Sequence, residues 1–256
     1  MTTGMNRRFF LGLMASGAVS LMANNRFEKV HKKDDSLWIT DKQVHVFLSV
    51  AKKIELVKRT VGQGNFNIIS FDDMLKIASR YSRIGKFTPQ EVAFMEEIFY
   101  QNPNIHGFYG KRTVPSITTK INRKDVSKIP HTGHYLFHGH SKKSYIRVIG
   151  DVGKSLILTS GVRGVPKQMN LYFNKIKRTG GNISLASRSL APPAYSYHSV
   201  GDFDVGKIGW GYKNFTVSFI TTKEFWRLRQ LSYISMRYTV NNKEGVRFEP
   251  WHVKII

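Results

Sequence analysis

The residues of this chain best suited to chemistry lie in the tetrapeptide Glu249-Pro250-Trp251-His252. Its carboxylate and imidazole are three residues apart, in a chain where Asp and Glu number 17 against 40 Lys and Arg. A Glu can act as a general base and a His as a metal ligand. The pair also fits a surface Glu and a core His at the end of an edge strand. Metal chemistry therefore requires further ligands elsewhere in the chain.

Residues 195–206 offer such ligands, because they contain His198, Asp202 and Asp204 between glycines. A His and an Asp close in sequence, joined by a distant His from another strand, form a three-ligand zinc site that leaves one position open for water. His198, Asp204 and His252 fit this pattern. Zinc lowers the pKa of its water from about 15.7 to about 7, and Glu249 would take the proton. A polar loop with a capping Asp is the alternative for the His198 stretch alone.

Two further stretches complete a set of three ordered motifs. Ser160-Gly161-Val162-Arg163 is followed by Gln168, and residues 191–201 read APPAYSYHSVG. Together with Glu-Pro-Trp-His, they resemble the motifs of zinc D-alanyl-D-alanine carboxypeptidases of the VanY type, in the wider lysostaphin, D-Ala-D-Ala-peptidase and Hedgehog-like metallopeptidase group. The family patterns are approximately Ser-Gly-Tyr-Arg-Ser with a downstream Gln, Ser-x-His-x-x-Gly-x-x-x-Asp, and Glu-Pro-Trp-His. The resemblance covers roughly residues 130–256 and leaves residues 24–110 uncovered.

The resemblance implies roles for seven residues. The expected zinc ligands are His198, Asp204 and His252. The expected general base is Glu249, and Arg163 would polarise the scissile carbonyl or hold a substrate carboxylate. Ser196 would hydrogen-bond the terminal carboxylate of the substrate, and Gln168 would orient either the substrate or Arg163. Without the resemblance, Arg163 also fits a solvated surface charge.

The sequence departs from the family pattern at two positions. The family places its Asp seven residues after the His, where this chain has Val205. Asp204 lies six residues after the His and is preferred because an aliphatic residue follows it, as in the family. Asp202, four residues after the His, remains the alternative ligand. The second departure is Val162, which replaces the usual Tyr and would alter substrate preference more than chemistry.

The resemblance implies an exported zinc peptidase that removes the terminal D-Ala from peptidoglycan stem peptides. An L,D-carboxypeptidase or a cross-link endopeptidase would use the same site. A non-catalytic module that binds the cell wall is a rival from another class. The sequence contains no His-Glu-x-x-His helix, no nucleotide-binding Gly loop and no Ser nucleophile elbow.

Charge and the first residues indicate where the protein acts. The net charge is +23 over 256 residues, with a pI near 10.2, which predicts attraction to anionic polymers. Arg7-Arg8 precede a short apolar run that ends at Ala23. This pattern is typical of a twin-arginine signal, so we expect export to the periplasm or cell envelope and no nucleic-acid partner. The chain has no Cys and cannot use disulfides.

The elements that must position these residues follow from apolar periodicity. The sequence predicts an α+β fold, in which a small antiparallel-sheet peptidase domain flanked by helices follows a small helical unit. The expected segments are a signal (1–23), a linker (24–40), the helical unit (41–110) and the catalytic domain (111–256). Helices are expected from Asp41 to Gly62, after a Ser70 cap and after a Thr88 cap.

Short β-branched runs in the second half predict strands. We expect strands over residues 145–149, 156–159 and 215–219, and a terminal pair over 233–240 and 247–255. Helices are expected over residues 168–177 and 225–231.

A second group of histidines lies outside the motifs. It comprises His131, His134, His138 and His140. No acid lies among them and glycines interrupt the run, so we expect polar residues that line a cleft, with metal or substrate contact as the alternative.

Overall fold

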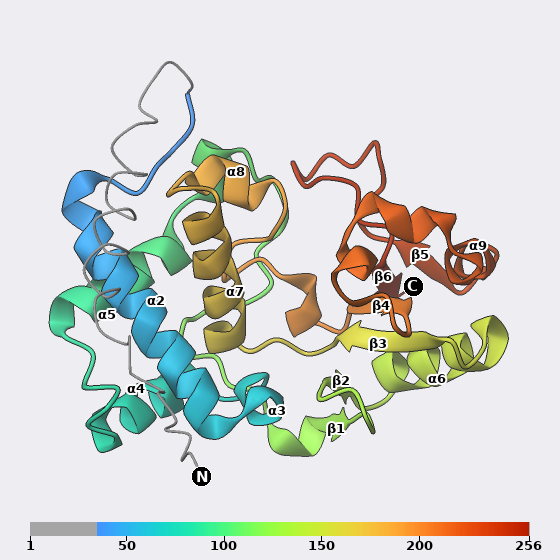
Figure 1. Cartoon of the computed structure of the whole chain (residues 1–256), viewed down its shortest axis with the longest axis horizontal. Helices are drawn as coiled ribbons and strands as arrows, with labels where there is room; N and C mark the ends of the chain where they lie inside the picture. Colours follow the sequence, from blue (N-terminus) through green and yellow to red (C-terminus); the bar gives the residue numbers. More distant parts are fainter. Residues whose placement is uncertain (1–34, 256) are drawn as a thin grey trace, which may run out of the picture. The chain divides into compact units, whose positions relative to one another are not determined.

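The computed structural model describes residues 35–255, so the predicted signal and most of the predicted linker lie outside the described residues. Ser36–Ile256 forms one compact unit (Figure 1). Its fold is α+β, with helices and small antiparallel sheets, as the sequence predicts. None of the helices within residues 35–255 is long and apolar enough to span a membrane. The boundary expected near residue 110 stays a prediction.

The predicted N-terminal helices are confirmed. They are α2 (Asp41–Val61), α4 (Phe71–Arg80) and α5 (Pro89–Tyr100). A short helix that the sequence does not predict, α3 (Gln63–Phe66), follows α2. Ser70 and Thr88 each form a capping box with the acid three residues later. The buried stripe of α2 recurs at three- and four-residue spacing and consists of Val44, Phe47, Val50, Ile54 and Val57.

Helix α7 (Val165–Arg178) joins these helices to the rest of the chain. It contacts α2 and α4, and α2 also packs against α5 (Figure 1). Phe173 of α7 lies edge-on to Phe47 at 5.8 Å and 5.9 Å from Phe94, measured between ring centroids. The segment before α2 is attached here as well, because Ile39 N donates a hydrogen bond to Gly181 O just beyond α7. The helical segment and α7 therefore share one apolar core.

A four-stranded antiparallel sheet carries the motifs. Its order is β3 (Leu156–Ser160), β4 (Phe203–Lys207), β6 (His252–Ile255) and β5 (Ile234–Met236). The strand predicted over 156–159 and the terminal strand pair are confirmed, although β5 and β6 are shorter than predicted. In the β4–β6 ladder, Asp204 is the register partner of His252. The sheet thus brings two expected ligands side by side.

The remaining elements are short or pack on this sheet. They are η1 (Pro103–His106), η2 (Arg123–Asp125), β1 (Val126–Lys128), β2 (Tyr135–Phe137), α8 (Ile183–Ser187), η3 (Tyr197–Ser199) and α9 (Lys223–Arg229). Strands β1 and β2 form a separate antiparallel pair. The helices predicted over 168–177 and 225–231 are confirmed as α7 and α9.

The strand predicted over residues 145–149 is wrong, because these residues lie in α6 (His140–Val152). The buried face of this helix consists of Ser141, Ser144, Tyr145, Val148 and Val152. Two of the five are serines, so the helical period is not visible when only apolar residues are counted. Ser141 Oγ donates to Gly201 O at 2.8 Å, which satisfies its hydroxyl inside the protein.

The strand predicted over residues 215–219 is also wrong. This stretch joins two 3₁₀ helices, η4 (Gly211–Phe215) and η5 (Val217–Thr221). Asn214 binds both backbone groups of Lys207, accepting from N at 2.8 Å and donating to O at 3.0 Å. Thr216 accepts from Ser218 N and caps η5. Side chains therefore satisfy the local backbone in place of a strand ladder.

Candidate metal centre

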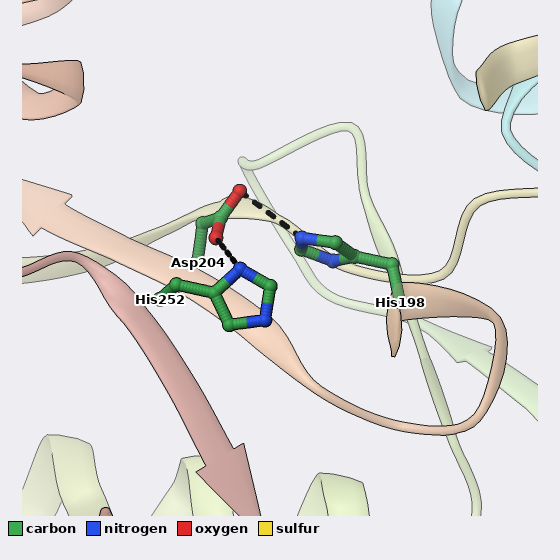
Figure 2. Close-up of side chains that lie close together, drawn as sticks. All are labelled: His198, Asp204 and His252. Atoms are coloured by element: carbon green, nitrogen blue, oxygen red, sulfur yellow. Dashed lines mark ion pairs between the residues drawn. The ribbon is translucent and has the colours of Figure 1, made fainter. Parts of the chain in front are cut away.

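Three expected ligands converge at one point. Asp204 and His252 come from paired strands, and His198 lies on η3, just before β4. Figure 2 shows each oxygen of Asp204 facing one imidazole. Asp204 Oδ2 lies 3.2 Å from His198 Nε2, and Oδ1 lies 3.3 Å from His252 Nδ1. The three ligand atoms all lie within 4.8 Å of one another, and all three side chains are buried.

The outer nitrogen of each imidazole has a partner of its own. His198 Nδ1 lies 2.9 Å from Gly161 O, so Nδ1 carries the proton and Nε2 faces the cluster. His252 Nε2 lies 3.2 Å from Asp202 Oδ2, which leaves Nδ1 facing inward. Outer contacts of this kind fix the orientation and tautomer of metal-binding histidines.

Asp202 and Asp204 therefore differ in position. Asp202 receives hydrogen bonds from Arg237 Nε at 2.6 Å and Nη2 at 3.1 Å, and it contacts His252 from outside the cluster. Asp204 faces inward, between the two imidazoles. Of the two acids that the sequence leaves open, Asp204 is the one that the geometry brings into the ligand cluster.

The cluster has the properties that a zinc site requires. His198 Nε2 and Asp204 Oδ1 are buried without a hydrogen-bond partner, and such atoms are costly unless a ligand satisfies them. Burial and the Arg163 charge lower the pKa of His198 to about 4, so the ring is neutral and able to bind a metal at neutral pH. Burial would raise the pKa of Asp204, but His198 and Arg163 outweigh it and keep the pKa below its ordinary value. Two imidazole nitrogens and one carboxylate match a catalytic zinc set.

Glu249 lies beside this cluster. Its Oε2 is 3.8 Å from His252 Nδ1, and its residue is 8% exposed on the cavity wall. Burial, reinforced by the charge of Asp204, raises the pKa of Glu249 to about 7. A carboxyl group with a pKa near neutrality can both accept and return a proton.

Arg163 faces the cluster from the loop that follows β3. It donates to Asp204 Oδ2 at 2.6 Å and to Ser160 Oγ at 2.9 Å, and its Nη1 lies 3.4 Å from Gln168 Oε1. Gln168 is buried and also donates to Ala191 O at 2.7 Å. Of the two functions expected for Gln168, these contacts favour orienting Arg163.

This loop passes close to a neighbouring backbone. A Cβ on Gly161 would lie 2.0 Å from Tyr135 O, so a side chain does not fit at this position. Val162 N donates to the same carbonyl at 2.7 Å. The glycine therefore allows the close approach that sets the direction of Arg163.

A cavity of about 460 Å³ opens onto the cluster. His198, Asp204, His252, Glu249, Arg163 and Ser196 all line it. Its size lies within the usual range for small-molecule sites. All the expected site residues except Gln168 thus share one cavity.

A family model matches the C-terminal part of the chain. Residues 143–256 match the family model described as VanY: D-alanyl-D-alanine carboxypeptidase. Residues 143–256 are a VanY-family domain. No curated protein matches this chain.

Solved structures resemble the chain only distantly. The LdcB LD-carboxypeptidase is 18% identical with a TM-score of 0.47, over 61% of this chain and 78% of that chain. VanYB in complex with D-Alanine-D-Alanine is 19% identical with a TM-score of 0.44, over 58% and 84%. A variant of the vancomycin resistance D,D-pentapeptidase VanY in complex with Zn(II) is 19% identical with a TM-score of 0.41, over 51% and 77%.

The second histidine group lies outside the VanY-family domain, and its members are separated from one another. His131, His138 and His140 are exposed, and His138 lies near Ser127 Oγ. His134 alone lines the cavity, and its Nδ1 is buried without a partner. Within residues 35–255, the only group of three or more such side chains close enough to bind one metal is the His198 cluster.

Several cavity residues were not identified from the sequence. Tyr238 lines the cavity with its ring 4.9 Å from that of His252, and Arg237 next to it binds Asp202. No sequence pattern links Arg237 to Asp202 across 35 residues. Lys167 also lines the cavity and could have been noticed, because it lies four residues after Arg163, inside the VanY-family domain.

Proposed function

We propose that this protein is a zinc-dependent carboxypeptidase that removes the terminal D-Ala from peptidoglycan stem peptides. The observation that carries the proposal is the convergence of His198, Asp204 and His252 beside a cavity-facing Glu249. Membership of residues 143–256 in the VanY family supports the same reaction class.

His198 would bind Zn²⁺ through Nε2, His252 through Nδ1 and Asp204 through its carboxylate. Zinc bound there would supply a Lewis acid that polarises the scissile carbonyl and activates water. Asp202 would keep His252 in the tautomer that this requires.

Glu249 would carry the proton in this reaction. Its carboxylate lies at the cavity surface, where it can take a proton from the attacking water and deliver it to the leaving amine nitrogen. Its buried surroundings favour this exchange, because they hold the proton near neutral pH.

Arg163 and Ser196 would act on the substrate. The guanidinium presents fixed donors toward the centre, which suits the developing negative charge on the carbonyl oxygen. Ser196 is buried at 3% exposure and lines the same cavity, so its hydroxyl can donate to the terminal carboxylate. Gln168 would hold Arg163 in place.

The test is release of D-Ala from a stem pentapeptide, followed by mass spectrometry with and without a chelator. We expect release that stops with chelation and returns with zinc. Failure to release any residue from zinc-loaded protein would contradict the proposal. Tetrapeptides and cross-linked dimers in the same assay separate the L,D-carboxypeptidase and endopeptidase alternatives, and binding without cleavage would indicate a wall-binding module.

We further propose that the protein acts in the periplasm or cell envelope after twin-arginine export. The Arg7-Arg8 pair supports this location, and the net charge of +23 suits anionic envelope polymers. Replacing both arginines with Lys should retain the protein in the cytoplasm, as cell fractionation would reveal. Unchanged export of this variant would contradict the proposal.

A further inference from the structure

One face of helix α7 forms a long wall of the cavity. The residues on this face are Lys167, Asn170, Leu171, Asn174, Lys175 and Arg178. Their spacing of three and four residues places them on one side of the helix. The eleven helical steps from Lys167 to Arg178 rise about 16 Å, which equals roughly five residues of extended peptide. The cavity is therefore long enough to contact a substrate well beyond the cleaved bond.

The charges of this cavity are unevenly distributed. The acids that line it are Asp204 and Glu249, and both belong to the candidate metal centre. The rest of the lining carries basic side chains, including Lys58, Lys167 and Lys175. A ligand that extends away from the centre therefore meets basic side chains and no further acid in the cavity lining.

Within residues 35–255, neither the Lys167 nor the Lys175 ammonium of this wall has a hydrogen-bond or ion-pair partner, and Lys167 is the one that lies near Arg163 and His134. It is half-buried and forms no hydrogen bond or ion pair with any of the residues 35–255. Burial, with the neighbouring charges of Arg163 and Lys58, lowers the pKa of Lys167 to about 8. An anion bound beside it would relieve both effects, since buried charges are stable when paired.

Two residues outside the VanY-family domain lie near Lys167. Lys58 of α2 lines the cavity, although its Nζ also pairs with Glu55 at 2.6 Å. His134 precedes β2 and lines the cavity with a buried, unpartnered Nδ1. Burial and the charge of Lys167 lower the pKa of His134 to about 4, so the neutral ring can donate one hydrogen bond.

Asn67, between α3 and α4, fixes these parts relative to one another. Its side chain donates to Gly133 O at 2.9 Å, next to His134. Its backbone carbonyl accepts from Gly164 N at 2.7 Å, next to Arg163. Asn67 is buried at 2% exposure. The helical segment thus determines where both His134 and the start of α7 lie.

We propose that Lys167, with Lys58 and His134 beside it, binds a carboxylate of the substrate peptide, and that residues 58–67 therefore belong to the substrate site. This inference rests on the proposed function, because it assumes a peptide whose cleaved bond lies over the metal centre. The carboxylate is either the terminal one or an internal glutamate carboxylate, and both would pair with the Lys167 ammonium in the same way.

Peptide binding to zinc-loaded Glu249→Gln protein tests the inference without turnover. The probes are a stem pentapeptide, the same peptide with a terminal carboxamide, and the same peptide with an internal carboxamide. Lys167→Met should weaken the parent peptide about tenfold, the loss expected for one charge-assisted hydrogen bond. It should not further weaken the binding of the peptide whose carboxamide replaces the bound carboxylate, because that peptide has already lost the contact. The carboxamide peptide whose affinity does not change therefore identifies which carboxylate Lys167 binds.

Lys177→Met is the matched control, because Lys177 is exposed on the same helix and does not line the cavity. It should bind all three peptides as the parent protein does, and Lys167→Arg should keep most of the affinity. Equal weakening of all three peptides by Lys167→Met, or no weakening of the parent, would overturn the inference. Thermal unfolding of each variant identifies any loss of fold.

The outcome is separable from that of the proposed function. If protein with Glu249 intact binds zinc but releases no D-Ala, the proposed function fails, while the three dissociation constants still decide the carboxylate site. If D-Ala is released but Lys167→Met does not distinguish the peptides, the carboxylate site alone fails.

Discussion

The two sides of the cavity differ in how their polar atoms are satisfied. In the candidate metal centre, each imidazole has a partner for its outer nitrogen, and only the inner atoms lack one. On the other side, Lys167 and the Nδ1 of His134 face the cavity without a hydrogen-bond or ion-pair partner among residues 35–255. The first side is pre-organised around one point, as chemistry requires. The second offers unpaired charge along a wall, as recognition of an extended ligand requires.

Replacing Glu249 should have the largest effect, because it removes the proposed proton transfer and leaves the Lys167 side of the cavity unchanged. Glu249→Gln should keep zinc but lower kcat by about a thousandfold, the usual scale for general acid–base catalysis. Peptide release and zinc content should be measured on the same sample. Glu244→Gln is the control, since Glu244 lies nearby but does not line the cavity. Substantial release by Glu249→Gln would contradict the mechanism.

Asp202→Asn and Asp204→Asn test the different positions of the two acids in the candidate metal centre. Asp202→Asn weakens the outer support of His252, so zinc affinity should fall about 10- to 100-fold in a chelator competition. Asp204→Asn should lower the affinity more, because Asp204 faces the cluster itself. The reverse order would show that the two acids have been assigned the wrong way round.

Asn67→Ala tests whether the helical side sets the recognition wall. The change leaves Gly133 O without its buried donor, so the free energy of unfolding should fall by about 2 kcal/mol. KM for the pentapeptide should rise while zinc affinity stays unchanged. Asn104→Ala, at an exposed position on η1 away from the cavity, is the control for both measurements. An equal loss of zinc affinity would contradict the division between the two sides.

The smallest expected effect is a pH dependence of stability that arises from His106. This residue of η1 contacts α8 through Ser187. Burial lowers the pKa of His106 to about 4, and its Nδ1 lies 2.8 Å from Ser187 Oγ. Between pH 6.5 and 4 the unfolded chain binds a proton that the folded chain does not, so stability falls as the pH falls through this range. Between pH 7 and 5 the loss should be at most about 2 kcal/mol.

Urea denaturation in the presence of a chelator measures this loss. His106→Asn should lower the difference in stability between the two pH values, compared with the unchanged chain. If the variant shows the same difference, other groups cause the pH dependence.

The sequence predicts the helices with capping boxes well, and it selects three candidate ligands that the fold brings together, because both depend on local signals. Thr88 and Ser70 define helix starts through residues three positions away, and the Glu249–His252 spacing is equally local. The sequence leaves Asp202 and Asp204 undecided, because their positions depend on the β4–β6 register. In the structure they contact opposite nitrogens of the same imidazole.

The features that the sequence does not predict correctly also have physical causes. Helix α6 was predicted as a strand because Ser141 and Ser144 complete its buried face with hydroxyls in place of apolar groups. The sequence marks Lys167 only by its place near Arg163; the proposed role depends on what α2 and the 131–134 loop place beside it.

The pairing of Asp204 with His252 also has a consequence for how the chain folds. Successive residues of a strand point to opposite faces, so a slip of β6 by one residue would turn His252 away from Asp204. Such a slip would separate two of the candidate ligands, and metal binding would lower the free energy of the native alignment relative to it. A zinc ion at this site would act as a selector of strand register during folding, in addition to any part in catalysis.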